Sequence, residues 1–261
     1  LRKLLEDDAP EVAREAVRSA GRLGKRALVH RLVDRIAEPW LTDDIVAALA
    51  QLGDRIVGTL RDYLVDRDTP AEIRRELPAA LQGIGTPAAQ SVLVESVLDG
   101  DTAVRLRVVT ALNKLVQLHP ERPFDRGIVE TALDAEITGH YRTYQVLGTM
   151  GGSLTGAEPV MQALRESLAQ ERERIFRLMK VLYPAYDLHS AFVGVQSDDV
   201  AVHDNALEFL ENVMPPAVRA LVEDRGDASR VTVALAPRVD TTMRTVEIAQ
   251  SLVRVSPASY G

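Results

Sequence analysis

The sequence predicts an all-α protein, an α-solenoid of stacked two-helix repeats. Apolar residues recur at steps of three and four along almost the whole chain of 261 residues, which is the spacing of amphipathic helices. No stretch alternates apolar and polar residues over the length of a strand. A short pattern also returns about every thirty residues, and that period has room for two helices and two turns.

The repeating pattern is nine residues long, and its first four copies begin 29, 32 and 31 residues apart. One helical hairpin cannot bury its apolar faces alone, whereas stacked hairpins bury them against their neighbours. An aliphatic residue lies four positions before each copy, so the register extends beyond the nine residues. The copies are AVRSAGRLG at 16–24, IVAALAQLG at 45–53, LPAALQGIG at 77–85 and VVTALNKLV at 108–116, with a more distant one, ALEFLENVM, at 206–214.

Both ends of the expected helices carry signals. Gly24, Gly53 and Gly85 each close a copy of the pattern, and glycine tolerates the left-handed conformation in which helices commonly end. We therefore expect the first helix of each of these repeats to stop there. Three tetrapeptides resemble a capped helix start: DAPE at 8–11, TPAE at 69–72 and TGAE at 155–158.

The next-to-last position of the pattern holds Leu23, Leu52, Ile84 and Leu115. Because these residues share one register, we expect all four to be buried between helices. Pro78 lies inside the third copy, and a proline in a helix interior removes a hydrogen bond. We expect it near the start of that helix, or at a kink there.

The pattern divides the chain into three parts. Residues 1–136 carry the regular repeats, residues 137–196 form an irregular helical segment, and residues 197–261 form C-terminal helical repeats. The repeats are expected at about 8–36, 38–66, 69–99 and 101–136, with a glycine-rich break at 148–156 and further helical pairs near 198–225 and 227–255.

Composition excludes several classes of protein. The net charge of −7 argues against a general nucleic-acid binder, whose affinity depends on neutralising phosphates. The absence of cysteine excludes disulfides, thiolate metal sites and a cysteine nucleophile. The sequence contains no run of 18 apolar residues, so it predicts no membrane-spanning helix. The chain begins LRKLLEDD without a methionine, and we expect it to be part of a longer protein.

No catalytic, cofactor or metal site is predicted, and the chain is not expected to be an enzyme. No two of the histidines have the three- or four-residue spacing of a helical metal site. GTMGGSLTG at 148–156 admits a phosphate-loop interpretation, but it lacks the GK[ST] ending and favours a connector between helices. Ser153 and Ser190 have no GxSxG setting. The histidines are His30, His119, His140, His189 and His203.

Two groups of residues are candidates for binding a partner. Tyr141, Arg142, Tyr144 and Gln145 combine aromatic rings with hydrogen-bond donors, as the centres of protein interfaces do. The alternative is ordinary packing where the repeats change geometry.

The second candidate group is a basic strip in which Arg174 and Arg177 are the contact residues, flanked by Arg172 and Lys180. The alternative is a solvated helix face, since Glu173 and Arg177 are four apart and can pair on one surface.

Two-helix repeats with this spacing and an LG or IG ending resemble HEAT repeats. A segment of about 45 residues, at 173–216, is similar to the soluble HEAT module of bacterial ATP/ADP translocase-like carriers, which are related to the major-facilitator transporters. The similarity lies in RIFRL at 174–178, LYP at 182–184 and NALEFLENV at 205–213. The resemblance implies a cytoplasmic module that contacts a transmembrane carrier, or an adjoining cyclic-nucleotide-binding domain of the same polypeptide.

Two functions follow as hypotheses. The first is a non-catalytic scaffold for protein–protein or interdomain contacts, without nucleic acid and without spanning the membrane itself. The second is a stand-alone HEAT protein with a small-molecule role, either nucleotide sensing or lyase-like. That role needs a pocket with convergent polar groups.

Overall fold

The computed structural model describes residues 1–7, 9–150 and 158–213. Within those ranges the chain is helical and contains no strand, so the predicted all-α class is confirmed. The α-helices are α1 (Pro10–Leu23), α2 (Val29–Asp34), α3 (Thr42–Leu52), α4 (Val57–Val65), α5 (Ala71–Ile84), α6 (Pro87–Glu95), α7 (Thr102–Leu118), α8 (Arg126–Met150), α9 (Glu158–Leu182), α10 (Leu188–Gly194) and α11 (Val200–Val213). Short 3-10 helices are η1 (Leu4–Glu6), η2 (Arg26–Leu28), η3 (Gly53–Ile56) and η4 (Ser96–Leu98).

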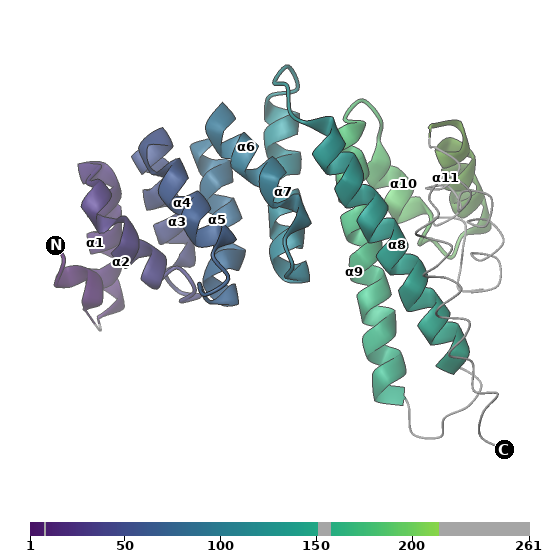
Figure 1. Cartoon of the computed structure of the whole chain (residues 1–261), viewed down its shortest axis with the longest axis horizontal. Helices are drawn as coiled ribbons and strands as arrows, with labels where there is room; N and C mark the ends of the chain where they lie inside the picture. The colour runs from purple at the N-terminus through teal and green to yellow at the C-terminus, as the bar shows by residue number, and fades with distance from the viewer. Residues whose placement is uncertain (8, 151–157, 214–261) are drawn as a thin grey trace. The chain divides into compact units, whose positions relative to one another are not determined.

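The chain divides into two compact units. Among the described residues, the first unit comprises residues up to 135 and 173–185, and the second comprises residues 136–150, 158–172 and 186–213. In the first unit α1 packs on α3, α3 on α5 and α5 on α7, so these helices form a row in chain order (Figure 1). The interior of this row is aliphatic, with Leu49, Leu77 and Leu112 fully buried.

The predicted glycine stops are confirmed. Gly24, Gly53 and Gly85 are the residues that follow α1, α3 and α5, with φ of 63°, 67° and 69°. Among the described residues these are the only positions with positive φ. The stretch AVRSAGRLG is thus the end of the first helix together with the residue that terminates it.

The predicted burial of the shared register is correct for Leu52 and Leu115 but wrong for Leu23, whose side chain is 56% exposed. Gly21 faces α3, and two residues turn a helix by about 200°. Leu23 therefore points away from α3. Helices α3 and α5 have a neighbour in the row on both sides, whereas among the described residues no helix of the row precedes α1. Ile84, at the end of α5, is half-buried.

Of the predicted helix starts, the one at Pro10 is confirmed and the capping box at 69–72 is wrong. Pro10 does begin α1, as expected, and Asp7 accepts a hydrogen bond from the Ala9 N–H at 3.0 Å. The capping box at 69–72 does not form, because α5 begins after Pro70 and the Thr69 hydroxyl donates instead to Asp66. Residue 8 of the tetrapeptide at 8–11 and residues 155–157 of the tetrapeptide at 155–158 lie outside the described residues.

Pro78 is the eighth residue of α5 and is buried, so its expected place near the start of that helix is wrong. The helix continues to Ile84 in spite of the missing N–H. Flanking residues Leu77, Ala80 and Leu81 are all fully buried. Burial of this apolar face offsets the cost of the proline.

The last turns of α9 belong to the first unit. Asn113 of α7 donates a hydrogen bond to the Arg177 carbonyl at 2.6 Å, and Arg126 donates to the Leu182 carbonyl at 2.9 Å. The Arg126 guanidinium also lies 5.8 Å from the centre of the Tyr183 ring. These contacts tie the C-terminal end of α9 to α7 and to the first turn of α8.

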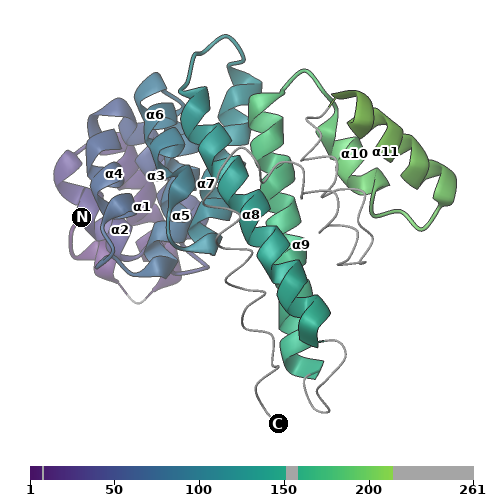
Figure 2. The ribbon, with the colours of Figure 1, turned by 45° about the vertical axis from the view of Figure 1, so that its right-hand side comes forward.

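In the second unit, residues 136–150 of α8 and residues 158–172 of α9 run side by side (Figure 2). Helices α10 and α11 pack on each other at a close approach of Gly194 to Ala206. Among the described residues, no helix combines the length and the apolar character that a bilayer crossing requires. Of the glycine-rich break expected at 148–156, residues 148–150 are instead the last residues of α8. Residues 151–156 and the helical pair expected at 227–255 lie outside the described residues. The predicted domain boundaries stay predictions.

Candidate binding sites

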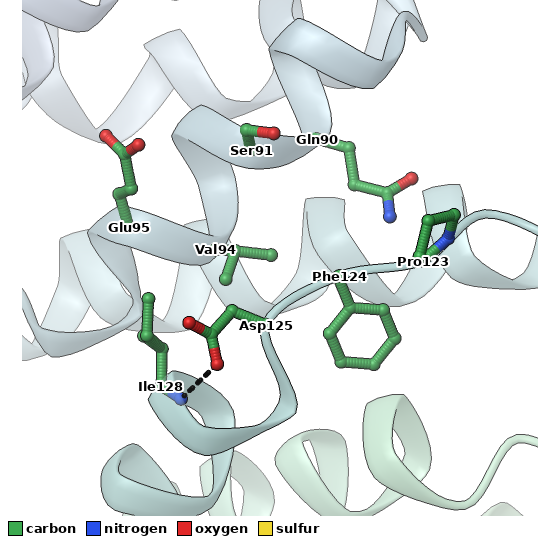
Figure 3. Close-up of a pocket in the computed structure, with 8 residues that line it drawn as sticks. All are labelled: Gln90, Ser91, Val94, Glu95, Pro123, Phe124, Asp125 and Ile128. Carbon is green, nitrogen blue, oxygen red and sulfur yellow. Dashed lines mark hydrogen bonds between the residues drawn. The ribbon is translucent and has the colours of Figure 1, made fainter.

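A pocket opens in the first unit between α6 and the segment that leads from α7 into α8 (Figure 3). Its volume is about 210 Å³. Four residues on one face of α6 line one side, and the loop and the first turn of α8 line the other. The lining residues are Gln90, Ser91, Val94, Glu95, Pro123, Phe124, Asp125 and Ile128.

The apolar part of the pocket is formed by Val94, Phe124 and Ile128. Gln90 is only 3% exposed, and its Oε1 atom accepts no hydrogen bond from a described residue. Figure 3 shows the Gln90 amide extending toward the segment at Pro123. Unsatisfied buried amide oxygens are rare because each loses its hydrogen bonds to water.

The pocket's charged residues are both acidic. Asp125 precedes α8, and its Oδ1 atom accepts hydrogen bonds from the N–H groups of Gly127 at 2.9 Å and Ile128 at 3.4 Å. Both bonds end on the same oxygen, so Oδ2 is available to another donor. Glu95 is exposed and pairs with Arg61 at 3.0 Å. No lysine or arginine lines the pocket.

A second polar site is a buried cluster in the second unit. His140 of α8 is fully buried, and its Nδ1 atom lies 3.0 Å from Oε2 of Glu171 on α9. The hydroxyls of Thr143 and Ser167 each lie 2.9 Å from Glu171 Oε1 and can donate to it. The ring of Tyr144 meets the imidazole edge-on, with centroids 4.8 Å apart. The cluster therefore links these parts of α8 and α9.

Competing effects set the charge of Glu171. Burial disfavours the carboxylate and by itself raises its pKa, whereas hydrogen bonds from His140, Thr143 and Ser167 favour the charged form. The hydrogen bonds prevail, and the pKa of Glu171 is lowered from its ordinary value. The Ser167 hydroxyl is directed to the carboxylate and not to the imidazole, so the group lacks the nucleophile–base contact of a hydrolase. The cluster is suited to holding two helices together.

The sequence-predicted contact residues of α8 fall on different sides of the helix. Arg142 is exposed and Tyr141 is half-buried. Tyr144 is only 6% exposed, because it lies one turn after His140 and faces α9 with it. Gln145 is half-buried, with Oε1 accepting no hydrogen bond from a described residue. Tyr144 thus has little surface for direct contact with a partner, and Arg142 is the exposed residue of the group.

The predicted basic strip is not a continuous surface. Arg174 is only 3% exposed, since its face of α9 turns inward with Leu178. Arg177 is partly exposed and pairs with Glu173 at 2.6 Å, which is the pairing that the alternative interpretation expected. The Arg174 side chain is therefore too buried to contact a partner directly. The Arg177 side chain remains accessible.

The described residues contain no group of three or more histidine, aspartate or glutamate side chains that could hold a metal ion. The His140–Glu171 pair is enclosed between helices and supplies two such groups, which is fewer than that.

Sequence reasoning missed both sites. The buried cluster has a visible signal, because His140 and Thr143 are three apart, and Ser167 and Glu171 are four apart, on two helices that pack together. The pocket has a weaker one, since it depends on where the loop at 119–125 passes over α6. That path is a tertiary feature with no local pattern.

Comparison of the sequence with protein-family models and with curated proteins finds no match to this chain.

Proposed function

We propose that the chain is a HEAT-type α-solenoid that acts as a non-catalytic scaffold for protein contacts. The observation that carries the proposal is the row of α1, α3, α5 and α7, each packed on the next in chain order. The first three of these helices end in a glycine with positive φ, which agrees with a unit repeated along the chain.

Ion pairs at repeat spacing support the same interpretation. Arg18 pairs with Asp44 at 2.9 Å across α1 and α3, and Arg75 pairs with Asp101 at 3.1 Å across α5 and α7; the residues of each pair are 26 apart in sequence. On the second helices of the pairs, Arg61 of α4 pairs with Glu95 of α6. Each exposed pair contributes little stability. The like pairing across α1 and α3 and across α5 and α7 agrees with stacked repeats, an architecture that binds partners on its extended surface.

The setting we propose is the cytoplasmic side of a bacterial membrane carrier. It rests on the resemblance of residues 173–216 to the HEAT module of ATP/ADP translocase-like proteins. In this setting the chain contacts the transmembrane carrier or an adjoining regulatory domain of the same polypeptide. Contact, and not chemistry, is its mechanism.

The setting is tested by translating the reading frame upstream of Leu1. About a dozen apolar segments of roughly 20 residues each are expected there. A frame that begins close to Leu1, or that encodes a different kind of domain, would remove the carrier from the proposal.

The non-catalytic role is tested by incubating the purified chain with ATP and ADP and measuring phosphate release and nucleotide interconversion. We expect no turnover above the buffer control. Turnover of a nucleotide that co-purifies with the chain would replace the scaffold with an enzyme.

A further inference from the structure

We propose that the pocket between α6 and the 119–125 loop binds one arginine side chain that a partner protein presents. The inference rests on the proposed scaffold function and specifies the chemistry of one contact between the scaffold and its partner. It is carried by the size of the pocket, the charge of its lining and the buried amide of Gln90.

Size favours a single side chain over a cofactor. Pockets that enclose small-molecule ligands are typically about 300–1,000 Å³. This pocket, at about 210 Å³, falls below that range. Val94 is almost fully buried and Ile128 is half-buried, so together they offer an apolar wall along which a methylene stem can lie.

Charge favours a cation. Asp125 and Glu95 are the charged lining residues, and no basic side chain lines the pocket. The hydrogen bonds from the start of α8 hold the Asp125 carboxylate in place through Oδ1 and leave Oδ2 for a ligand. Glu95 already pairs with Arg61, but that pair is exposed and readily shares its carboxylate. The net charge of −7 adds long-range attraction for a basic segment.

The acceptors favour arginine over lysine. The Gln90 amide oxygen is buried and has no partner. A half-turn of the amide places the oxygen where the nitrogen now lies, and from there it can accept a hydrogen bond from the ligand. Ser91 donates its hydroxyl to the Pro87 carbonyl at 3.1 Å, which leaves the oxygen lone pairs free to accept. Amide, hydroxyl and two carboxylates are spread around the pocket. A planar guanidinium with five donors can reach several of them, whereas an ammonium is a compact point charge.

The test is a titration of the whole chain, labelled at its valine and isoleucine methyl groups, followed by NMR. The probes are the peptides acetyl-Gly-Gly-X-Gly-Gly-amide, in which X is arginine, citrulline or leucine. Citrulline keeps the shape of arginine and removes its charge. We expect saturable shifts of the Val94 and Ile128 methyls with the arginine peptide alone, with a dissociation constant on the order of 1 mM.

Two variants ask whether the pocket carboxylates cause the binding. Asp125→Asn removes the charge and keeps the helix cap, because asparagine caps as well as aspartate. Glu95→Gln removes the other charge at an exposed site. Each is expected to weaken binding roughly threefold. The matched control is Asp134→Asn, which removes an exposed charge from the same helix outside the pocket and should leave the affinity unchanged.

Equal binding of the citrulline or leucine peptide, or no saturable shift at Val94 and Ile128, would overturn the proposal. An equal loss of affinity in Asp134→Asn would overturn it as well, because the attraction would then come from the net charge. If Asp125→Asn lowers the melting temperature, the affinity of the Glu95→Gln variant for the arginine peptide alone decides whether the pocket carboxylates cause the binding. None of these outcomes depends on the turnover or reading-frame tests, so the pocket and the scaffold function fail separately.

Discussion

At the scale of single residues, small side chains determine how closely neighbouring helices approach. A Cβ atom added to Gly21 would lie 2.9 Å from the Ala48 Cα and 3.2 Å from its Cβ, so α1 and α3 touch through their backbones at this point. Gly21 is therefore a contact position, and so is Gly83, where an added Cβ would lie 2.9 Å from the Ala50 Cβ. Their low volume is what the row of helices requires.

Gly21→Ala should destabilise the fold by about 1–3 kcal/mol, since the backbone of α3 must move to admit the methyl group. The control is Gly58→Ala in α4, where an added Cβ meets nothing within 4 Å. That variant should gain roughly 0.5–1 kcal/mol from helix propensity. Urea unfolding of the two variants measures the difference, and equal midpoints would show that α1 and α3 are not in this contact.

Glu171 makes stability depend on pH in the acid range. Its folded-state pKa is lowered from 4.5, so the charged carboxylate stabilises the fold above that value, and the contribution is lost as pH falls through the lowered pKa. Glu171→Gln should cost about 1–3 kcal/mol at neutral pH. Denaturant unfolding at a series of pH values should show this cost shrinking below about pH 4.5. A difference from wild type that is constant across pH would contradict the assignment.

At the scale of helices and turns, the helix C-termini at glycine residues could be predicted from the sequence. The helix N-termini that a side chain caps could not be predicted. Gly24 and Gly85 terminate helices because of a backbone preference that is visible in the residue type. The functioning caps, such as Thr86 before α6 and Asp101 before α7, depend on whether an oxygen reaches a particular N–H. The tetrapeptide at 69–72 has the right composition but makes a different hydrogen bond.

Burial along the row depends on the neighbours of each helix as well as on the register. Leu52 is buried and Leu23 is exposed, although both hold the same place in the repeat. The sequence shows the shared register, but it does not show which sides of each helix its neighbours cover.

This contrast gives a matched pair of variants. Leu52→Ala should destabilise the chain by about 2–5 kcal/mol, because it removes a buried side chain and leaves a cavity. Leu23→Ala should change stability by less than about 0.5 kcal/mol, since the side chain is already mostly in water. Equilibrium unfolding in urea measures both, and similar losses in the two variants would contradict the proposed row.

At the scale of the whole molecule, the class of the fold follows from periodicity, while the candidate sites do not. The spacing of apolar residues shows which face of each helix is apolar, and this is enough to predict that the chain is all-helical with its helices in pairs. The pocket at Gln90 depends on a loop crossing a helix 30 residues earlier in the sequence, and the His140–Glu171 cluster on two helices meeting in register. Such juxtapositions arise from packing, which one sequence does not display.

The central claim is that the chain acts through contact with another protein or domain. The most direct measurement is photo-crosslinking of the full-length protein in its own cells. A photoreactive residue is placed at Arg142, which is exposed on α8, at Ser91, on the rim of the pocket, and at Arg67, in an exposed turn, for comparison. The account predicts a discrete protein adduct at position 142 or 91 and none at 67. Absence of an adduct at both 142 and 91 would contradict it.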